Sequence, residues 1–555
     1  MSPSSRLTVP DLLHRDPHLV VDEDALLDLL GLAFLGRDLG TALDDALAGA
    51  ELRHGSWNPE FFERDLFIAD FARACSNLTI DGATYPANQR FLRKVLANVP
   101  VDVETIRMRQ GILRELSENA DMRRRFEATY KQLFALLSLF GTPGYQGSLD
   151  TASIHLEILS HAKDIIDRMA RDFAEATSAL RRLHESSVEI QASREYRTLA
   201  DVLAYESGMA DLGLAVRIGG DGRIRRVRVE ELEERRENRF WSPPWRRLRD
   251  RLRLVAGGYD FSNKELMNRL VNQVFTEIAP ALIPLIQLLG HLEFYLCALK
   301  FRDLARSRGL EVCLADFDGR RPLALESLFN PLLLQQAGPP VPCNIRNASE
   351  ESIILVTGPN SGGKTRLLQS LAWATVLGQS GAFAPAAAAT LPVFNGLFVS
   401  LVENETADQT EGRLGRELVR IRSLFEQMRM GSMVVLDELC SGTNPSEGVE
   451  VFAMVLRLLD RVKPTAFVTT HFLDFARSLE ASPPVPALDF LQVELDDEQS
   501  STYQFVAGVA PTSLAALTAA RLGVTFDRLS GLVIDDGDGS RESTLLEDEV
   551  DEAAQ

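Results

Sequence analysis

Apolar positions follow a helical period in one part of the chain and a strand pattern in another. Across 57–215 and 246–308 they recur every three or four residues, which predicts amphipathic helices. Consecutive apolar residues at 353–356, 433–436 and 466–468 predict short buried strands. The fold class that this pattern predicts is multidomain, with an α-helical region followed by an α/β domain.

Between the two helical parts the period changes to two. Residues 215–218 and 226–229 alternate around the turn Gly-Gly-Asp-Gly at 219–222, which predicts a two-stranded ribbon. The stretch 223–253 holds twelve arginines against six acids, with Trp241 and Trp245 between them. Two interpretations stay open. Either the arginines bind a phosphate backbone, or the acids at 230–234 pair with nearby arginines on a solvated face. The DNA-binding candidates are Arg225, Arg226 and Arg228.

The first predicted strand leads directly into a glycine-rich loop. A complete G-x-x-x-x-G-K-[ST] phosphate loop is formed by Gly358, Pro359, Asn360, Ser361, Gly362, Gly363, Lys364 and Thr365. A helix is predicted at 366–377, and in a strand–loop–helix unit backbone N–H groups can cradle phosphate oxygens. We therefore expect Lys364 to reach the β- and γ-phosphates and the Thr365 hydroxyl to hold Mg²⁺. The alternative is a glycine turn that matches by chance, which the flanking strand and helix disfavour.

The other two predicted strands end in residues suited to nucleotide hydrolysis. Asp437 and Glu438 follow the strand at 433–436. Asp437 can join the Mg²⁺ shell, and Glu438 can orient or deprotonate an attacking water. His471 follows 466–470, where an imidazole can sense the γ-phosphate, although a lone histidine is often structural. The expected catalytic residues are Glu438 and His471, and the expected metal ligands are Thr365 and Asp437.

In this order the motifs resemble the ATPase domain of the MutS family of DNA mismatch-repair proteins, an ABC-type fold. The family's TGPN-x-x-GK[ST] is read at 357–365, G-x-F-x-PA at 381–386, DE-x-x-x-GT at 437–443 and T-H-[FY] at 470–472. The sequence at 330–332 stands where the family has His-Pro-hydrophobic, and 502–523 matches its ending. Asn-Pro-Ser-Glu-Gly at 444–448 is more similar to the second bacterial MutS branch than to the mismatch-recognising one.

The resemblance implies a helical core, lever and clamp ahead of a P-loop ATPase domain. The expected divisions are an N-terminal segment at 1–56, the helical core and lever at 57–304 with the ribbon as clamp near 215–230, the ATPase domain at 305–534 and an acidic disordered tail at 535–555. The resemblance also implies ATP and Mg²⁺ as cofactors, a homodimer, and DNA bound through its backbone.

Two positions depart from the family pattern. Its signature Ser-Thr-Phe falls on 412–414, so Gly412 and Arg413 would have to make the contact with ATP across the dimer. The aromatic residue that stacks on adenine ahead of the phosphate loop has no counterpart, and Val341 stands near that place. We therefore expect nucleotide affinity to depend mainly on phosphate contacts.

Phe61-Phe62-Glu63 imitates the Phe-x-Glu wedge of mismatch-recognising MutS. In that family the wedge opens a mixed α/β domain, whereas helical patterning here resumes by Leu66. We expect Phe61 and Phe62 to be core residues in a short form without the mismatch-recognition domain. An Smr-like nuclease domain is not expected after residue 530.

Composition restricts the class and location of the protein. Apolar content of 45% and charged content of 25% are those of an ordinary globular protein. Five cysteines, an odd number without a C-x-x-C pair, indicate a reducing cytosol and argue against a disulfide framework or zinc site. No signal peptide or membrane span is expected, so the predicted location is cytoplasmic, with nucleoid association compatible. The net charge of −20 does not exclude a DNA partner, because nine acids lie in 535–555 and the ribbon is locally basic.

Three function classes fit these observations unequally. The leading interpretation is a dimeric ATPase clamp that senses DNA structure or damage. The alternative is an ATP-switched clamp on ribosomes or another protein, without direct mismatch recognition. A transporter ATPase subunit is disfavoured, since an LSGGQ-type signature is missing and the helical region precedes the loop.

Overall fold

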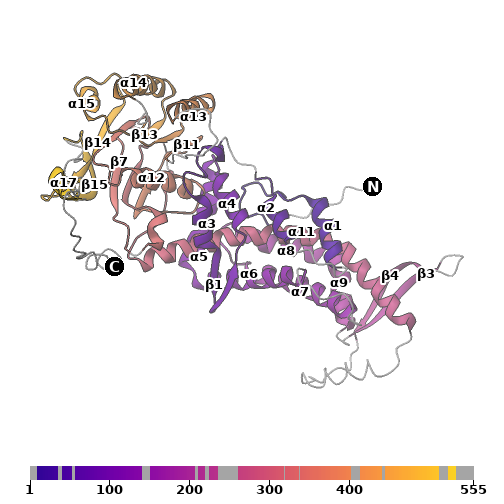
Figure 1. Cartoon of the computed structure of the whole chain (residues 1–555). Helices are drawn as coiled ribbons and strands as arrows, with labels where there is room; N and C mark the ends of the chain where they lie inside the picture. The colour runs from indigo at the N-terminus through magenta and orange to yellow at the C-terminus, as the bar shows by residue number, and fades with distance from the viewer. Residues whose placement is uncertain are drawn as a thin grey trace, which may run out of the picture.

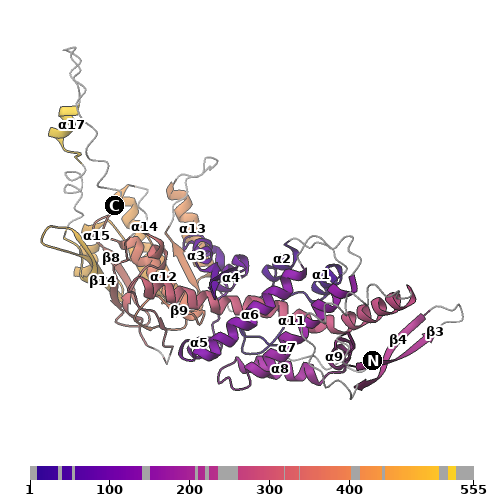
Figure 2. The ribbon, with the colours of Figure 1, turned by 90° about the horizontal axis from the view of Figure 1, so that it is seen from below.

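Helices form one part of an elongated molecule, and its largest sheet lies at one end (Figures 1 and 2). The computed structural model describes residues 9–34, 41–52, 57–140, 151–206, 210–218, 224–234, 261–317, 319, 321–336, 338–401, 413–439, 444–511 and 523–532. The ribbon of β3 and β4 lies at the opposite end from this sheet in both views. Helix α11 (Phe261–Ser307) runs between the two ends.

The helical part is built from short helices packed around α11. These helices are α1 (Glu23–Phe34), α2 (Ala42–Ala48), α3 (Ile68–Ser76), α4 (Gln89–Ala97), α5 (Val103–Glu118), α6 (Ala120–Phe140), α7 (Thr151–Asp172), α8 (Arg181–Ala192) and α9 (Arg194–Glu206), with the 3₁₀ turn η1 (Pro59–Phe61). Asp102 caps α5 by accepting the Thr105 N–H at 2.7 Å, and Asn88 caps α4 in the same way. The N-terminal segment therefore contains two helices, and both pack on the helical core.

Helix α11 continues through Pro280 and Pro284, although each proline removes one helical hydrogen bond. Every residue from Ala281 to Leu299 is buried, so packing on every side of this stretch offsets that loss. Within the described residues α11 also has the length and apolar composition to cross a membrane, over Val271–Ser307. Its most apolar window is completely buried in the protein, as in the core helix of a globular fold.

Two hairpins interrupt the helical region. β1 (Asn77–Ile80) and β2 (Ala83–Pro86) pair antiparallel around Asp81 and Gly82, whose φ angles are 50° and 80°. The expectation that 57–215 is wholly helical is wrong here, because an Asp-Gly turn with both φ angles positive favours a hairpin. The second hairpin pairs β3 (Ala210–Ile218) with β4 (Ile224–Glu234), so the alternating ribbon is observed and is longer than the pattern indicated.

A six-stranded sheet organises the C-terminal part in the order β11-β12-β13-β8-β14-β15. All neighbours are parallel except β14 and β15. Its strands are β8 (Ile353–Thr357), β11 (Leu397–Ser400), β12 (Met433–Leu436), β13 (Thr465–Thr469), β14 (Leu488–Leu495) and β15 (Ser501–Ala507). The three strands predicted from apolar runs are its central members β8, β12 and β13. Smaller elements flank the sheet, namely β5 (Cys313–Leu314), β6 (Ala324–Leu328), η2 (Pro331–Gln335), β7 (Cys343–Arg346), β9 (Phe383–Ala384) and β10 (Ala388–Thr390). The short helix α17 (Phe526–Leu532) lies apart from the sheet in Figure 2.

The two faces of this sheet belong to different cores. Ile354 and Val356 of β8 join the large core that contains α12 (Lys364–Gln379), whereas Ile353 and Leu355 join a second core. Helices that cover the second face are α13 (Arg413–Gln427), α14 (Pro445–Val462) and α15 (Leu473–Ala481). Because successive side chains of a strand point to opposite faces, the unbroken apolar run is what a sheet covered on both sides requires.

The large core is continuous between the helical region and the sheet region. Trp373 of α12 is fully buried, and its indole N–H donates to the Leu66 carbonyl at 3.1 Å. Trp57 donates to the Phe394 carbonyl at 3.0 Å. The two regions are thus bound to each other by satisfied buried donors as well as by apolar packing.

Phe61 and Phe62 lie at the junction of the two cores. Phe61 is 5% exposed and packs against Phe398, with ring centroids 5.1 Å apart, while Phe62 is 1% exposed in the large core. The prediction that both are core residues is confirmed, because neither ring is available to wedge a base pair.

Candidate nucleotide-binding site

The glycine-rich loop connects β8 to α12 at the carboxyl edge of the parallel strands. Gly358 and Gly363 have φ angles of 140° and 84°, in the region that favours glycine. A Cβ on Gly358 would lie 2.6 Å from Val493 Cγ2, so the loop also fits closely against β14. Asn360, Ser361 and Thr365 are exposed at the loop surface, whereas Pro359 and Gly362 are buried.

Lys364 is held inside the loop at 4% exposure. Its Nζ donates to the carbonyls of Gly358 at 2.9 Å and Pro359 at 3.0 Å. Burial lowers the pKa of Lys364, and the negative charges of Glu438 and Asp437 oppose that shift. An ammonium held by two neutral carbonyls is poised to exchange them for a phosphate, which binds it more strongly.

Asp437 follows β12 and connects the start of α12 to the end of β13 through its two carboxylate oxygens. Thr365 Oγ1 donates to Oδ2 at 2.5 Å, and Thr469 Oγ1 donates to Oδ1 at 2.5 Å. The Glu438 N–H in turn donates to Thr469 Oγ1 at 2.7 Å. The three strands that precede these residues are neighbours in the sheet, and their carboxyl ends share one edge.

Glu438 has a φ angle of 48°, which is uncommon for a residue with a side chain. Backbone outliers of this kind often occur at functional sites, where the surrounding structure holds them in place. Here the hydrogen bond from the Glu438 N–H to buried Thr469 fixes the peptide, and the side chain stays partly exposed.

Some of the remaining predicted site residues lie in described elements, and others lie outside the described residues. His471 is exposed just after β13, and its ring lies 4.2 Å from that of Phe472. Arg413 is the first residue of α13, and the arginines at 225, 226 and 228 lie on β4. Gly412, the turn at 440–443 and the acidic tail lie outside the described residues.

A cavity of about 380 Å³ opens beside the phosphate loop. Tyr503 and Phe505 of β15 line it together with Val341, Asn330 and Arg366. The Tyr503 ring packs against the loop so closely that a Cβ on Gly363 would meet its Cδ1 at 3.0 Å. The Tyr503 ring therefore lines the same cavity as Val341, although it comes from far along the chain. The sequence had indicated no aromatic residue at this place.

Sequence reasoning assigned no role to Thr469 or Tyr503. Thr469 is the last residue of β13 and forms part of a Thr-Thr pair before His471, which is a weak signal for a polar role at a strand end. Tyr503 gives no signal for a place beside the loop, because this neighbourhood depends on how β15 folds back over β14.

The donor set fits a hard divalent cation and a phosphate chain. A hydroxyl and a carboxylate lie side by side at Thr365 and Asp437, and oxygen donors of this kind are what Mg²⁺ prefers. The loop supplies backbone N–H groups and one ammonium for anionic oxygens. These features define a class, the α/β domains that bind a nucleotide phosphate between a strand and a helix.

Comparison with known proteins narrows this class to one family. Residues 354–526 match the model of MutS domain V. "Endonuclease MutS2" of Thermomicrobium roseum is 31% identical over 205 residues, which cover 37% of this chain and 25% of that protein. "Endonuclease MutS2" of Streptococcus agalactiae serotype Ia is 29% identical over 242 residues, 43% of this chain and 29% of that protein. The chain therefore covers little more than a quarter of the length of these relatives. The resemblance to the MutS family is confirmed for this region, which carries a MutS-family domain.

Proposed function

We propose that the protein binds and hydrolyses ATP with Mg²⁺ at the carboxyl edge of its parallel sheet. The observation that supports this most directly is the chain of contacts from Thr365 through Asp437 and Thr469 to Glu438, beside the glycine loop. A strand-end carboxylate and a loop hydroxyl that already touch would supply two of the six ligands of an octahedral magnesium ion, with phosphate oxygens and water supplying the rest.

Each residue of the site has a separate task in this proposal. Backbone N–H groups of 358–363 and the Lys364 ammonium bind the phosphates, and Thr365 with Asp437 holds Mg²⁺, which neutralises charge that develops on the phosphate oxygens. Glu438 orients or deprotonates the attacking water, and Thr469 keeps Glu438 and Asp437 in register through its hydroxyl. His471 lies at the same edge and senses the γ-phosphate, and Tyr503 offers a ring face for the base.

The test of hydrolysis is the substitution Glu438→Gln. Binding of ATP should be kept, because the phosphate and metal contacts remain, while the hydrolysis rate should fall at least about 100-fold. Affinity is measured with a fluorescent ATP analogue, and single-turnover phosphate release gives the rate. Equal rates in the two proteins would remove Glu438 from the mechanism.

We further propose that the protein is a homodimeric clamp on DNA of duplex or branched form. The basic ribbon supports this part, because Arg226 and Arg228 occupy alternate positions of β4 and Arg226 is the register partner of Arg217. The relatives carry the MutS name, and contacts to the DNA backbone need only a local excess of positive charge. A cytoplasmic location belongs to the same proposal.

The DNA partner is tested by salt titration of binding to matched, mismatched and four-way-junction DNA. Replacing Arg225, Arg226 and Arg228 by Ala should flatten the dependence of log affinity on log salt by up to about three units. ATP hydrolysis without DNA should not change. An unchanged slope would exclude the ribbon as the DNA surface. Failure to bind any of the three DNAs would instead favour a clamp on ribosomes or another protein.

The dimer is tested by light scattering with and without ATP. Residues near Gly412, Arg413 and Asn444 are expected to face the ATP of the second copy, so ATP should tighten the dimer. A monomer with ATP bound, at concentrations well above micromolar, would contradict this part of the proposal while leaving the ATP site intact.

A further inference from the structure

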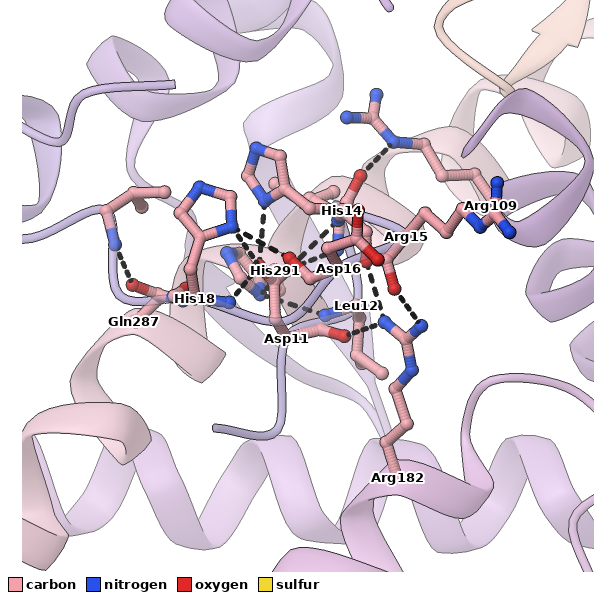
Figure 3. A network of polar contacts seen from close by, with 12 residues as sticks. Asp11, Leu12, His14, Arg15, Asp16, His18, Arg109, Arg182, Gln287 and His291 are labelled. Atoms are coloured by element: carbon pink, nitrogen blue, oxygen red, sulfur yellow. Dashed lines mark hydrogen bonds and ion pairs between the residues drawn. The ribbon is translucent and has the colours of Figure 1, made fainter. Parts of the chain in front are cut away.

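A row of polar contacts, the polar seam, fixes the N-terminal segment to the long helix α11. Gln287, His291 and Tyr295 stand at four-residue intervals on α11, so they share one face. Gln287 accepts the Val20 N–H at 2.8 Å and donates to the His18 carbonyl at 2.9 Å. Tyr295 donates its hydroxyl proton to the Leu12 carbonyl at 2.5 Å. Figure 3 shows this segment lying along the polar face of the helix.

Three side chains of this segment bring potential metal ligands together. Asp11, His14 and His18 each offer one donor atom, and these atoms lie within 4.8 Å of one another. His14 Nδ1 is 2.8 Å and His18 Nδ1 is 3.7 Å from Asp11 Oδ2. Two ligand atoms of a tetrahedral ion with bonds of about 2.0–2.1 Å are separated by about 3.3 Å, which these two distances bracket.

We propose that Asp11, His14 and His18 form a binding site for a divalent transition metal of the zinc class. Two imidazoles and one carboxylate are a donor set that Zn²⁺ and Co²⁺ accept. The absence of paired cysteines argued against a zinc site from sequence, but none of these donors is a cysteine. His18 is 27% exposed, so its side of the site can admit the ion and a water as fourth ligand.

Metal binding would replace hydrogen bonds that the two imidazoles now make. His14 and His18 now place Nδ1 toward Asp11 Oδ2 and the Asp16 carbonyl, at 2.8 and 2.9 Å. A ring nitrogen that binds a metal carries no proton, so coordination through Nδ1 would place the proton of each imidazole on Nε2. The metal–nitrogen bonds replace those two hydrogen bonds. His291 remains beside the second carboxylate oxygen, with Nδ1 3.6 Å from Asp11 Oδ1.

Hydrogen bonds around Asp11, His14 and His18 hold this segment rigid, while nearby positive charges limit its affinity for a metal ion. Asp11 Oδ1 accepts the N–H groups of Leu13 at 2.8 Å and His14 at 3.0 Å. Arg182 donates to the Asp11 and His14 carbonyls, and Arg109 donates to the Leu13 carbonyl at 2.9 Å, as Figure 3 shows. A fixed carboxylate favours the metal, whereas two nearby guanidinium charges oppose it. We therefore expect binding weaker than that of zinc-finger sites.

The experiment uses the full chain, stripped with chelator and dialysed against Co²⁺ without nucleotide. We expect one Co²⁺ per chain with the visible absorption of a four-coordinate ion, displaced by Zn²⁺. His18→Gln, chosen because this side chain is the most exposed of the three, should weaken Co²⁺ binding at least about 10-fold, the loss of about 1.4 kcal/mol. His161→Gln, a histidine of α7 outside the cluster, should bind Co²⁺ like the wild type.

A further variant separates this site from the proposed ATP site. Asp437→Asn should retain the Co²⁺ spectrum, because Asp437 lies at the sheet edge. Loss of the spectrum in Asp437→Asn, or equal binding by His18→Gln and wild type, would overturn the proposal. So would wild-type protein that binds no Co²⁺, which would leave the cluster as a hydrogen-bonded structural seam.

Discussion

Two polar clusters of this molecule are built in opposite ways. The sheet-edge cluster consists of Lys364, Thr365, Asp437, Glu438 and Thr469, and it lies where parallel strands end. Thr365, Asp437 and Glu438 are exposed or partly exposed there, over the buried Lys364 and Thr469. The N-terminal cluster consists of Asp11, His14, His18, Gln287 and His291, and it is enclosed between the N-terminal segment and α11. The first cluster keeps polar atoms accessible to a ligand, whereas the second uses most of them to hold the segment to the helix.

Burial shifts the pKa values of titratable groups in the N-terminal cluster. It lowers the pKa of His291 to about 4, against the opposing charge of Asp11. Burial would raise the pKa of Asp11, but the hydrogen bond from His14 and the nearby imidazole charges hold it well below its usual range. The comparison indicates that changes at the sheet edge should affect ATP binding, and that changes at the N-terminal cluster should affect stability without affecting ATP binding. Four substitutions can test whether ligand binding and stability depend on different parts of the molecule.

The largest effect is expected from Lys364→Ala at the sheet edge. Loss of the ammonium removes the strongest phosphate contact, so ATP affinity should fall at least about 100-fold, or about 2.7 kcal/mol. The midpoint of thermal unfolding should change little, because only two carbonyl contacts are lost. Lys463→Ala is the matched control, since Lys463 pairs with Glu351 on the surface at 3.4 Å. A Lys364→Ala protein that unfolds far more easily but still binds ATP would contradict the expectation that the sheet-edge cluster serves ATP binding.

Gln287→Ala in the N-terminal cluster should lower stability and leave ATP affinity nearly unchanged. It leaves the Val20 N–H and the His18 carbonyl without their buried partner, which should cost about 2–3 kcal/mol of unfolding free energy. ATP affinity of the folded protein should stay within about twofold. Gln273→Ala on the same helix is the control, because Gln273 bonds only to Glu277 near the surface. Denaturant titration measures the difference, and equal midpoints for the two variants would show that the seam contributes nothing.

Glu293 of α11 should make the stability of the helical region depend on pH. Burial raises the pKa of this carboxyl on α11 to about 8, while bonds from the Asn88 N–H and the Tyr130 hydroxyl lower it. A raised folded-state pKa means that its stabilising contribution is complete below the unfolded value near 4.5. That contribution is lost as the pH rises toward 8, by about 1 kcal/mol per pH unit.

Glu293→Gln removes this dependence because the amide stays neutral. Its oxygen can accept the Asn88 N–H, and its NH₂ can donate to Tyr130 Oη. The variant should melt several degrees above the wild type at pH 8 and at nearly the same temperature at pH 5. Parallel melting curves across that range would show that Glu293 does not titrate there.

The smallest effect is expected at Tyr503, beside the phosphate loop. If its ring stacks on the base, Tyr503→Ala should weaken ATP binding about 5–10-fold, and Tyr503→Phe should bind nearly as well as the wild type. Affinity for inorganic triphosphate should not change, because that probe has no base. Equal losses for ATP and triphosphate would assign Tyr503 to support of the loop instead.

Motif and strand patterns predicted much of the sheet region correctly. β8, β12 and β13 follow from unbroken apolar runs, and the glycine loop follows from its spacing, because these signals are local in the chain. The hairpin of β1 and β2 was missed although Asp81-Gly82 marks it, since helical periodicity was extended over the whole region. The position of Tyr503 against Gly363 could not be predicted, because it depends on how β15 pairs with β14 far along the chain.

The sequence by itself thus determined the MutS-type motifs, the order of helical and sheet regions, and which residues at strand ends are chemically suited to a nucleotide. Tertiary structure decided that Trp57 and Trp373 join the two regions, that α11 continues through two prolines, and that the Leu12 N–H meets Nδ1 of His291. Contacts within one strand–loop–helix unit leave a pattern in nearby residues, because backbone geometry fixes their spacing. Contacts between residues almost 300 positions apart leave no such pattern, because burial and packing of the whole core bring them together.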